Sequence, residues 1–175
     1  HYETALKVVT SCKKERLRIV EGWAFKYHSQ HAIVKKHINN NRIGAVKYFD
    51  GQFTYPLPEP DNIRLKLELA GGVFYDSAGY PVAAAQLFIS NKPVSVFCMK
   101  NFDEKYLVDN FVQIQIEYEK NINVHTVAGF GLHYSSTYSI TGTKGRISVK
   151  RAYAVNENME TIISVETDEG DEEIT

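Results

Sequence analysis

Apolar residues repeat with two different periods along the chain. At steps of three and four residues, the spacing of one face of an amphipathic helix, they predict three helices. These predicted helices cover residues 3–14, 28–40 and 78–89. A short apolar run at 17–23 lies between the first two helices and predicts a buried strand.

Alternation with a period of two, which places successive side chains on opposite faces of a sheet, begins at residues 45–55 and dominates after Pro93. The later predicted strands are 94–99, 109–118, 122–128, 138–141, 146–149 and 161–165. In the strand 109–118, valine, isoleucine and tyrosine alternate with glutamine and glutamate. One face of the sheet is therefore expected to be apolar and the other polar.

Helices that come first and a run of strands that follows are typical of an α+β fold. We expect a largely antiparallel, open-faced sheet with helices packed on one face. No internal repeat or low-complexity linker divides the sequence, so residues 1–175 form a single predicted domain. Residues 166–175 carry six carboxylates and are expected to form a flexible acidic tail.

The composition argues against several classes of partner. Twenty basic and 21 acidic side chains give a net charge of −1 without a clustered basic face, so no nucleic acid partner is expected. No apolar run approaches the ~20 residues of a membrane span, and no signal peptide is visible. The two cysteines, Cys12 and Cys98, are expected to be free thiols, which suits a cytoplasmic protein.

The most distinctive stretch for chemistry is the Gly71-Gly72 pair and the residues after it. Two adjacent glycines permit backbone angles and close approaches that other residues resist. Asp76 and Tyr80 follow at a spacing of four, about one helical turn, so both side chains are expected to face one cleft. A phenol in that position can exchange a proton with a developing alkoxide. The alternative is that Asp76 only caps the next helix and Tyr80 only packs.

Other constellations carry less weight. His28 and His31 lie three residues apart, but no third ligand accompanies them, so no metal site is expected. Ser135 and Ser136 lie near His133 without a nucleophile elbow, which argues against a hydrolase triad. The tyrosine-rich strands lack the basic surroundings of an RNA-binding sheet.

The chain resembles the second domain of the glucose–fructose oxidoreductase, inositol dehydrogenase and MocA (Gfo/Idh/MocA) family. The family signature Gly-Gly-x-x-x-Asp-x-x-Tyr/His matches Gly71 to Tyr80. Segments 21–31, 41–46 and 138–147 agree with further family motifs in order and spacing, and the resemblance extends over nearly the whole chain.

The resemblance implies the substrate-binding and oligomerisation domain of an NAD(P)-dependent oxidoreductase that acts on a sugar. Tyr80 would be its catalytic proton donor or acceptor, and a tyrosine at this position is similar to members that act on nucleotide-linked keto-sugars. The residues implied for the substrate pocket are Asp76, Arg64, His28, Gly71 and Gly72. The family also implies a homodimer or tetramer that associates through the sheet face.

Two departures from the family pattern are visible. Ser29 stands where the family usually has proline. More seriously, the chain has neither the Gly-x-Gly-x-x-Gly turn of an N-terminal Rossmann domain nor the Glu-Lys-Pro motif whose lysine assists the tyrosine. NAD or NADP would then bind the full-length protein, and this fragment alone would bind no dinucleotide and catalyse nothing.

An alternative remains open on the sequence. The same domain would also serve as a non-catalytic dimerisation or interaction module of a multidomain protein, with the cleft residues as relics. Neither the sugar, the preference for NAD or NADP, nor the direction of the reaction follows from these residues.

Overall fold

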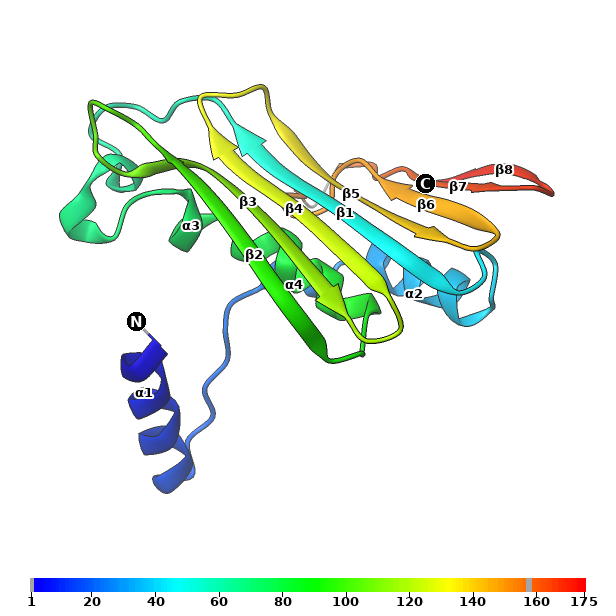
Figure 1. Ribbon diagram of the computed structural model, residues 1–175, viewed down its shortest axis with the longest axis horizontal. Coiled ribbons are helices and arrows are strands. Elements are labelled where there is room, and N and C mark those ends of the chain that lie inside the picture. The colour runs from blue at the N-terminus through cyan, green and yellow to red at the C-terminus, as the bar shows by residue number, and fades with distance from the viewer. Residues whose placement is uncertain (1, 157–158) are drawn as a thin grey trace.

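A computed structural model describes residues 2–156 and 159–175, and it confirms the α+β class (Figure 1). The helices are α1 (Tyr2–Lys14), α2 (Ser29–Asn39), α3 (Val73–Asp76) and α4 (Gly79–Phe88), with short 3-10 turns at Ala24–Tyr27, Ile63–Leu65 and Leu67–Leu69. The strands are β1 (Val46–Tyr55), β2 (Pro93–Phe102), β3 (Asp109–Tyr118), β4 (Ile122–Phe130), β5 (Ser135–Gly142), β6 (Gly145–Val149), β7 (Ile163–Thr167) and β8 (Gly170–Ile174).

All eight strands form one open sheet, in the order β2-β3-β4-β1-β5-β6-β7-β8. The other paired strands are antiparallel, but β1 and β4 lie side by side and run parallel (Figure 1). From β2 to β8, strands that follow one another along the chain are neighbours in the sheet, except that β1 inserts between β4 and β5. A parallel pair needs a crossover connection, and the segment that contains α3 and α4 belongs to it. Both strands end at the same edge of the sheet, beside α3 (Figure 1).

The core lies between one face of the sheet and the helices α2 and α4. Alternation along β3 is confirmed: Val112 and Ile116 are buried against the helices, whereas Gln115 is exposed on the other face. The buried alanines of α4 let the helix approach β1 closely. Gly51 makes that approach possible, because a Cβ there would lie 2.9 Å from the Cβ of Pro81.

The predicted buried strand at 17–23 is wrong. Residues 17–22 are exposed and pair with no strand in the described part of the chain, and Leu17 and Val20 are 64% and 72% exposed. The apolar pattern is present, but a strand forms only where a neighbouring strand satisfies its backbone N–H and C=O groups. The helix α1 buries none of its residues, and Figure 1 shows it standing away from the sheet.

The expected flexible tail at 166–175 also differs from the structure, which forms a β7–β8 hairpin there. Ile163 and Val165 are buried on the core side, and Ile174 packs against the same cluster. The turn has Gly170 at φ +133°, and the Thr167 hydroxyl donates to the Gly170 carbonyl. The carboxylates point into solvent, where their repulsion is screened, so apolar alternation and ladder hydrogen bonds decide the local structure.

The imidazole of His31 has two partners inside the core. Nδ1 lies 2.9 Å from the Tyr138 hydroxyl and Nε2 lies 3.1 Å from the Ala152 carbonyl. A carbonyl only accepts, so Nε2 carries the proton and Nδ1 accepts from the tyrosine. Burial lowers the pKa of His31 to about 4. This histidine, considered above as a metal ligand, is therefore neutral and bonded within the fold.

We expect the free energy of unfolding to fall as the pH falls from about 6.5 to about 4. In that window the unfolded chain binds a proton at His31 and the folded chain does not, at a cost of about 3 kcal/mol in total. Urea unfolding at several pH values should show that His31→Gln removes this slope. His133→Gln, at an exposed loop histidine, should retain it; an unchanged slope in His31→Gln would contradict the assignment.

Candidate functional site

A cavity of about 320 Å³ opens at the edge of the sheet where β1 ends. We call it the Tyr80 cavity; it is lined by Phe53, Tyr55, Pro56, Pro58, Asn62, Arg64, Asp76, Tyr80 and Tyr134. Three of the residues singled out from the sequence, Tyr80, Asp76 and Arg64, therefore meet in one space. The prediction that Tyr80 and Asp76 face one cleft is confirmed as geometry.

Tyr80 lies in the first turn of α4, inside a cage of aromatic rings. Its ring centroid lies 4.7 Å from that of Trp23, edge to face, and 5.2 Å from that of Phe53. Phe25 and Tyr153 contact it at 5.7 and 6.1 Å. No hydrogen bond within residues 2–156 and 159–175 uses its hydroxyl. The rings thus fix the phenol in position while its O–H stays available to a ligand in the cavity.

Gly79 shapes this cage. A Cβ at Gly79 would lie 2.7 Å from Cη2 of Trp23, closer than packed side chains tolerate. The glycine therefore allows the indole to lie over the start of α4 and against the Tyr80 ring.

Asp76 is held by two donors at the wall of the cavity. Arg64 Nε donates to Asp76 Oδ2 at 2.7 Å, and the Tyr55 hydroxyl donates to the same oxygen at 3.1 Å. Burial raises the pKa of Tyr55 to about 12, so Tyr55 remains a neutral donor. The hydrogen bond to Asp76 raises the pKa of Arg64. The other oxygen, Oδ1, makes no hydrogen bond among the described residues.

This arrangement removes the alternative that Asp76 is merely a helix cap. Asp76 is the last residue of α3, and the N-cap of α4 is Ala78, without a side-chain cap hydrogen bond. The carboxylate instead forms an ion pair with Arg64, with no net charge, and both side chains of the pair are only partly exposed. Such a pair keeps one carboxylate oxygen oriented without leaving an unpaired charge in the cavity.

Gly71 and Gly72, predicted to bind substrate, do not line the Tyr80 cavity. Their N–H groups donate to the carbonyls of Lys66 and Arg64. Gly72 has φ +101°, and a Cβ there would lie 2.8 Å from Oδ1 of Asp109. The glycine pair forms the bend from which α3 begins. Since Asp76 is the last residue of α3, the pair positions Asp76 and does not itself touch a ligand in the cavity.

Asp109 is the residue that sequence reasoning missed in this region. Its Oδ2 accepts the Phe74 N–H at 2.6 Å, and its Oδ1 accepts from Lys100 Nζ at 3.1 Å. Asp109 therefore anchors the first turn of α3, with Gly72 packed against it. The sequence pattern identifies Asp109 only as the start of the strand 109–118. An aspartate directly before an apolar run is the signal that points to this position.

His28 lies at a different cavity, of about 390 Å³. Its Nδ1 accepts the Gln30 N–H at 3.3 Å and caps α2. Phe25 and Tyr153, which cage Tyr80, also line this second cavity. The structure therefore does not bring His28 together with Tyr80 and Asp76.

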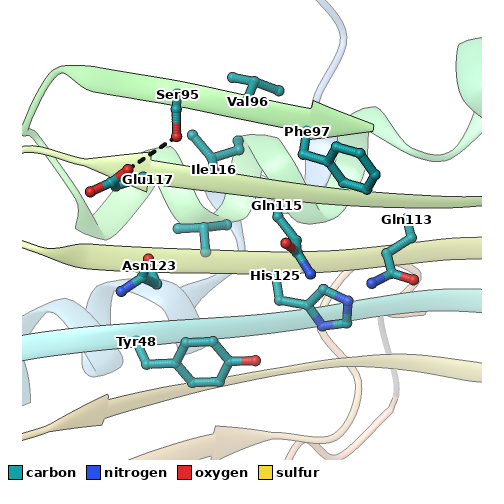
Figure 2. A pocket seen from close by; sticks show the side chains of 11 residues that line it. Tyr48, Ser95, Val96, Phe97, Gln113, Gln115, Ile116, Glu117, Asn123 and His125 are labelled. Carbon is teal, nitrogen blue, oxygen red and sulfur yellow. Dashed lines mark hydrogen bonds between the residues drawn. The ribbon is translucent and has the colours of Figure 1, made fainter. Parts of the chain in front are cut away.

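A broad pocket of about 670 Å³ lies on the open face of the sheet, away from the helices (Figure 2). Figure 2 shows Tyr48, Gln115 and His125 projecting from three strands into it. His125 Nδ1 lies 2.9 Å from Asp50 Oδ2, to which the Tyr48 hydroxyl also donates. His125 Nε2 is buried and has no hydrogen-bond partner among the described residues. The period-two pattern that marks Gln115 as outward-facing could have identified His125 as well.

Three further findings concern cofactors and environment. No group of three or more His, Cys, Asp or Glu in the described part of the chain is arranged to hold a metal ion. Cys12 and Cys98 are free thiols, as predicted. Within the described residues, every helix is too short or too polar to cross a membrane.

Residues 31–148 match the family model for the GFO/IDH/MocA C-terminal domain. The chain is 30% identical to a dTDP-3,4-didehydro-2,6-dideoxy-alpha-D-glucose 3-reductase of Saccharopolyspora spinosa, over 91% of this chain and 48% of that protein. It is 25% identical to the D-xylose 1-dehydrogenase (NADP(+)) 2 of Haloferax volcanii, over 95% of this chain and 50% of that protein.

The fold is shared with a 3-ketoreductase from Actinomadura kijaniata, solved with NADP and TDP-benzene. The TM-score is 0.89 at 22% identity, over 97% of this chain and 52% of that one. The chain thus spans about half the length of the relatives that it matches. Because the family model covers most of the sheet and the Tyr80 cavity, the chain belongs to the Gfo/Idh/MocA family and carries its C-terminal domain.

Proposed function

We propose that this chain is the substrate-binding half of an NAD(P)-dependent sugar oxidoreductase and that Tyr80 exchanges the proton at the reacting oxygen. The observation that carries the proposal is the Tyr80 phenol, caged by rings on one side and open to a cavity that Asp76 and Arg64 share. General acid–base catalysis needs a positioned donor within hydrogen-bond reach of the substrate, and this geometry provides one.

The protein's part in the reaction is proton transfer and orientation. When a keto-sugar is reduced, its carbonyl oxygen gains negative charge, and the Tyr80 O–H donates its proton to that oxygen. In the oxidative direction the phenolate accepts the proton of the sugar hydroxyl. Asp76 Oδ1 accepts a hydrogen bond from a neighbouring sugar hydroxyl, and Arg64 holds the Asp76 carboxylate in place.

The described residues do not themselves fit a dinucleotide. A pyrophosphate binds where a glycine-rich turn exposes free N–H groups at a helix N-terminus. At the Gly71-Gly72 bend the Phe74 N–H already donates to Asp109, whose carboxylate would repel a phosphate. The nicotinamide cofactor, which supplies the hydride when bound, therefore belongs in an N-terminal Rossmann domain of the full-length protein.

A nucleotide-linked keto-sugar is the substrate class that we favour over a free sugar. The support is Tyr80 at the last signature position, together with the 30% identity to the dTDP-sugar 3-reductase of Saccharopolyspora spinosa. The cavity is near the lower limit of the ~300–1,000 Å³ found for ligand sites, so it accommodates the sugar and leaves the nucleotide outside.

Self-association through the open sheet face is the second role that we propose. That face has no covering layer in the described chain, and His125 Nε2 is buried there without a partner. A second copy of the domain, in a homodimer or tetramer, would cover it. An interaction module without catalysis would use the same face, and the Tyr80 variant described below distinguishes the two.

We expect the isolated chain to bind neither NADH nor NADPH and to catalyse no turnover. Titration with each dinucleotide, followed by nicotinamide fluorescence, should show no saturable change with this chain. The full-length protein is the control: it should bind a dinucleotide and oxidise it when a dTDP-keto-sugar is added. Saturable binding to the isolated chain, or full-length protein without turnover on any sugar, would refute the proposal.

A further inference from the structure

Arg151 lies against Tyr134, a residue of the cavity wall. Its guanidinium carbon is 4.7 Å from the centroid of the Tyr134 ring, and both side chains are half-buried. The backbone of Arg151 is fixed as well, because it bridges Ser136 and its carbonyl accepts from Gln30 Nε2. The cation is therefore held at one place beside the Tyr80 cavity.

The other three arginines that follow residue 22 each donate to a protein partner. Arg42 pairs with Glu169, Arg64 with Asp76, and Arg146 donates to Ser139. The Arg151 guanidinium makes no ion pair or hydrogen bond within the described ranges 2–156 and 159–175. The guanidinium lies over the Tyr134 ring and uses none of its N–H donors on a described residue, so these donors are available to a ligand.

The charged residues that line the cavity, Asp76 and Arg64, pair with each other. Arg151 adds a positive charge beside Tyr134 that forms no ion pair among the described residues. A substrate whose sugar fills a cavity of about 320 Å³ must place any larger substituent outside it. A substituent that leaves past Tyr134 meets the free edge of the guanidinium.

We propose that Arg151, which lies over the Tyr134 ring, binds the diphosphate of a nucleotide-linked sugar and so selects such substrates over free sugars. The planar fork of an arginine matches two phosphate oxygens at once. The inference rests on the proposed function, because it assumes that the Tyr80 cavity holds the sugar. It adds the residue and the charge that decide the substrate class.

The test uses the full-length protein with Arg151→Gln and Arg151→Lys. Calorimetric titration with thymidine diphosphate should show an affinity about 10- to 100-fold lower for Arg151→Gln. Arg151→Lys, which keeps the charge but loses the fork, should show a smaller loss. The wild-type affinity should fall as salt rises, and this dependence should weaken in Arg151→Gln. Arg146→Gln, an arginine on the neighbouring strand β6, is the matched control and should bind like wild type.

Phosphate oxygens also occur on the nicotinamide dinucleotide, so a second titration measures NADPH. Unchanged NADPH affinity with weakened thymidine diphosphate binding supports the proposal; the reverse pattern, or equal thymidine diphosphate affinity in all variants, overturns it. The two proposals fail separately. Turnover of free sugars without thymidine diphosphate binding overturns the role of Arg151 alone. Arg151-dependent binding without any turnover overturns the proposed function alone.

Discussion

Tyr80→Phe is expected to lower kcat of the full-length enzyme by about 10²- to 10⁴-fold, because the variant loses the proton donor and keeps the ring. The four aromatic neighbours contact the ring rather than the hydroxyl, so the cage and the stability should not change. KM for the sugar substrate should change much less than kcat, since the lost interaction matters mainly in the transition state. Steady-state kinetics at saturating cofactor measures both constants.

Tyr75→Phe is the matched control for this prediction. Tyr75 is a tyrosine of α3 that is 60% exposed and does not line the Tyr80 cavity. Tyr75→Phe also removes a hydroxyl, but outside the cavity, so kcat should not change. Size-exclusion chromatography should show that both variants assemble like wild type. If Tyr80→Phe retains full activity, the cavity is not catalytic and the interaction-module hypothesis is favoured.

Gly72→Ala is expected to lower the free energy of unfolding by about 2–4 kcal/mol. Its φ of +101° and ψ of 160° lie in a region that only glycine occupies readily, and an L-residue there costs about 1–3 kcal/mol. In addition, the new Cβ would lie 2.8 Å from Asp109 Oδ1 and would displace a buried carboxylate from the Phe74 N–H. Denaturant titration measures the loss.

Gly170→Ala separates the two causes. Gly170 also has a positive φ, +133°, but nothing lies within 4 Å of a Cβ placed there. This variant should show the backbone cost only, about 1–2 kcal/mol. Equal losses in the two variants would mean that contact with Asp109 contributes nothing and that Gly72 matters for its backbone angles alone.

Sequence patterns predict helices and strands correctly where the spacing of apolar residues within the segment decides its structure. The alternation along 109–118 predicts β3 and its buried face, and the three- and four-residue spacing predicts α2 and α4 nearly to the residue. The predictions at 17–23 and 166–175 were wrong for opposite reasons. The first segment has a strand pattern but no neighbouring strand to pair with, and the second has a charged sequence but pairs in a hairpin with β7.

The sequence by itself determined the fold class, the family signature and the spacing of four residues between Asp76 and Tyr80, because periodicity and spacing are local properties. Only the tertiary structure decided that Arg64 joins this pair, that His28 does not, and that Gly72 serves Asp109 rather than a ligand. The reason is that these contacts join residues far apart along the chain. Which side chains meet at the end of β1 depends on how the crossover between the parallel strands β1 and β4 packs against the sheet.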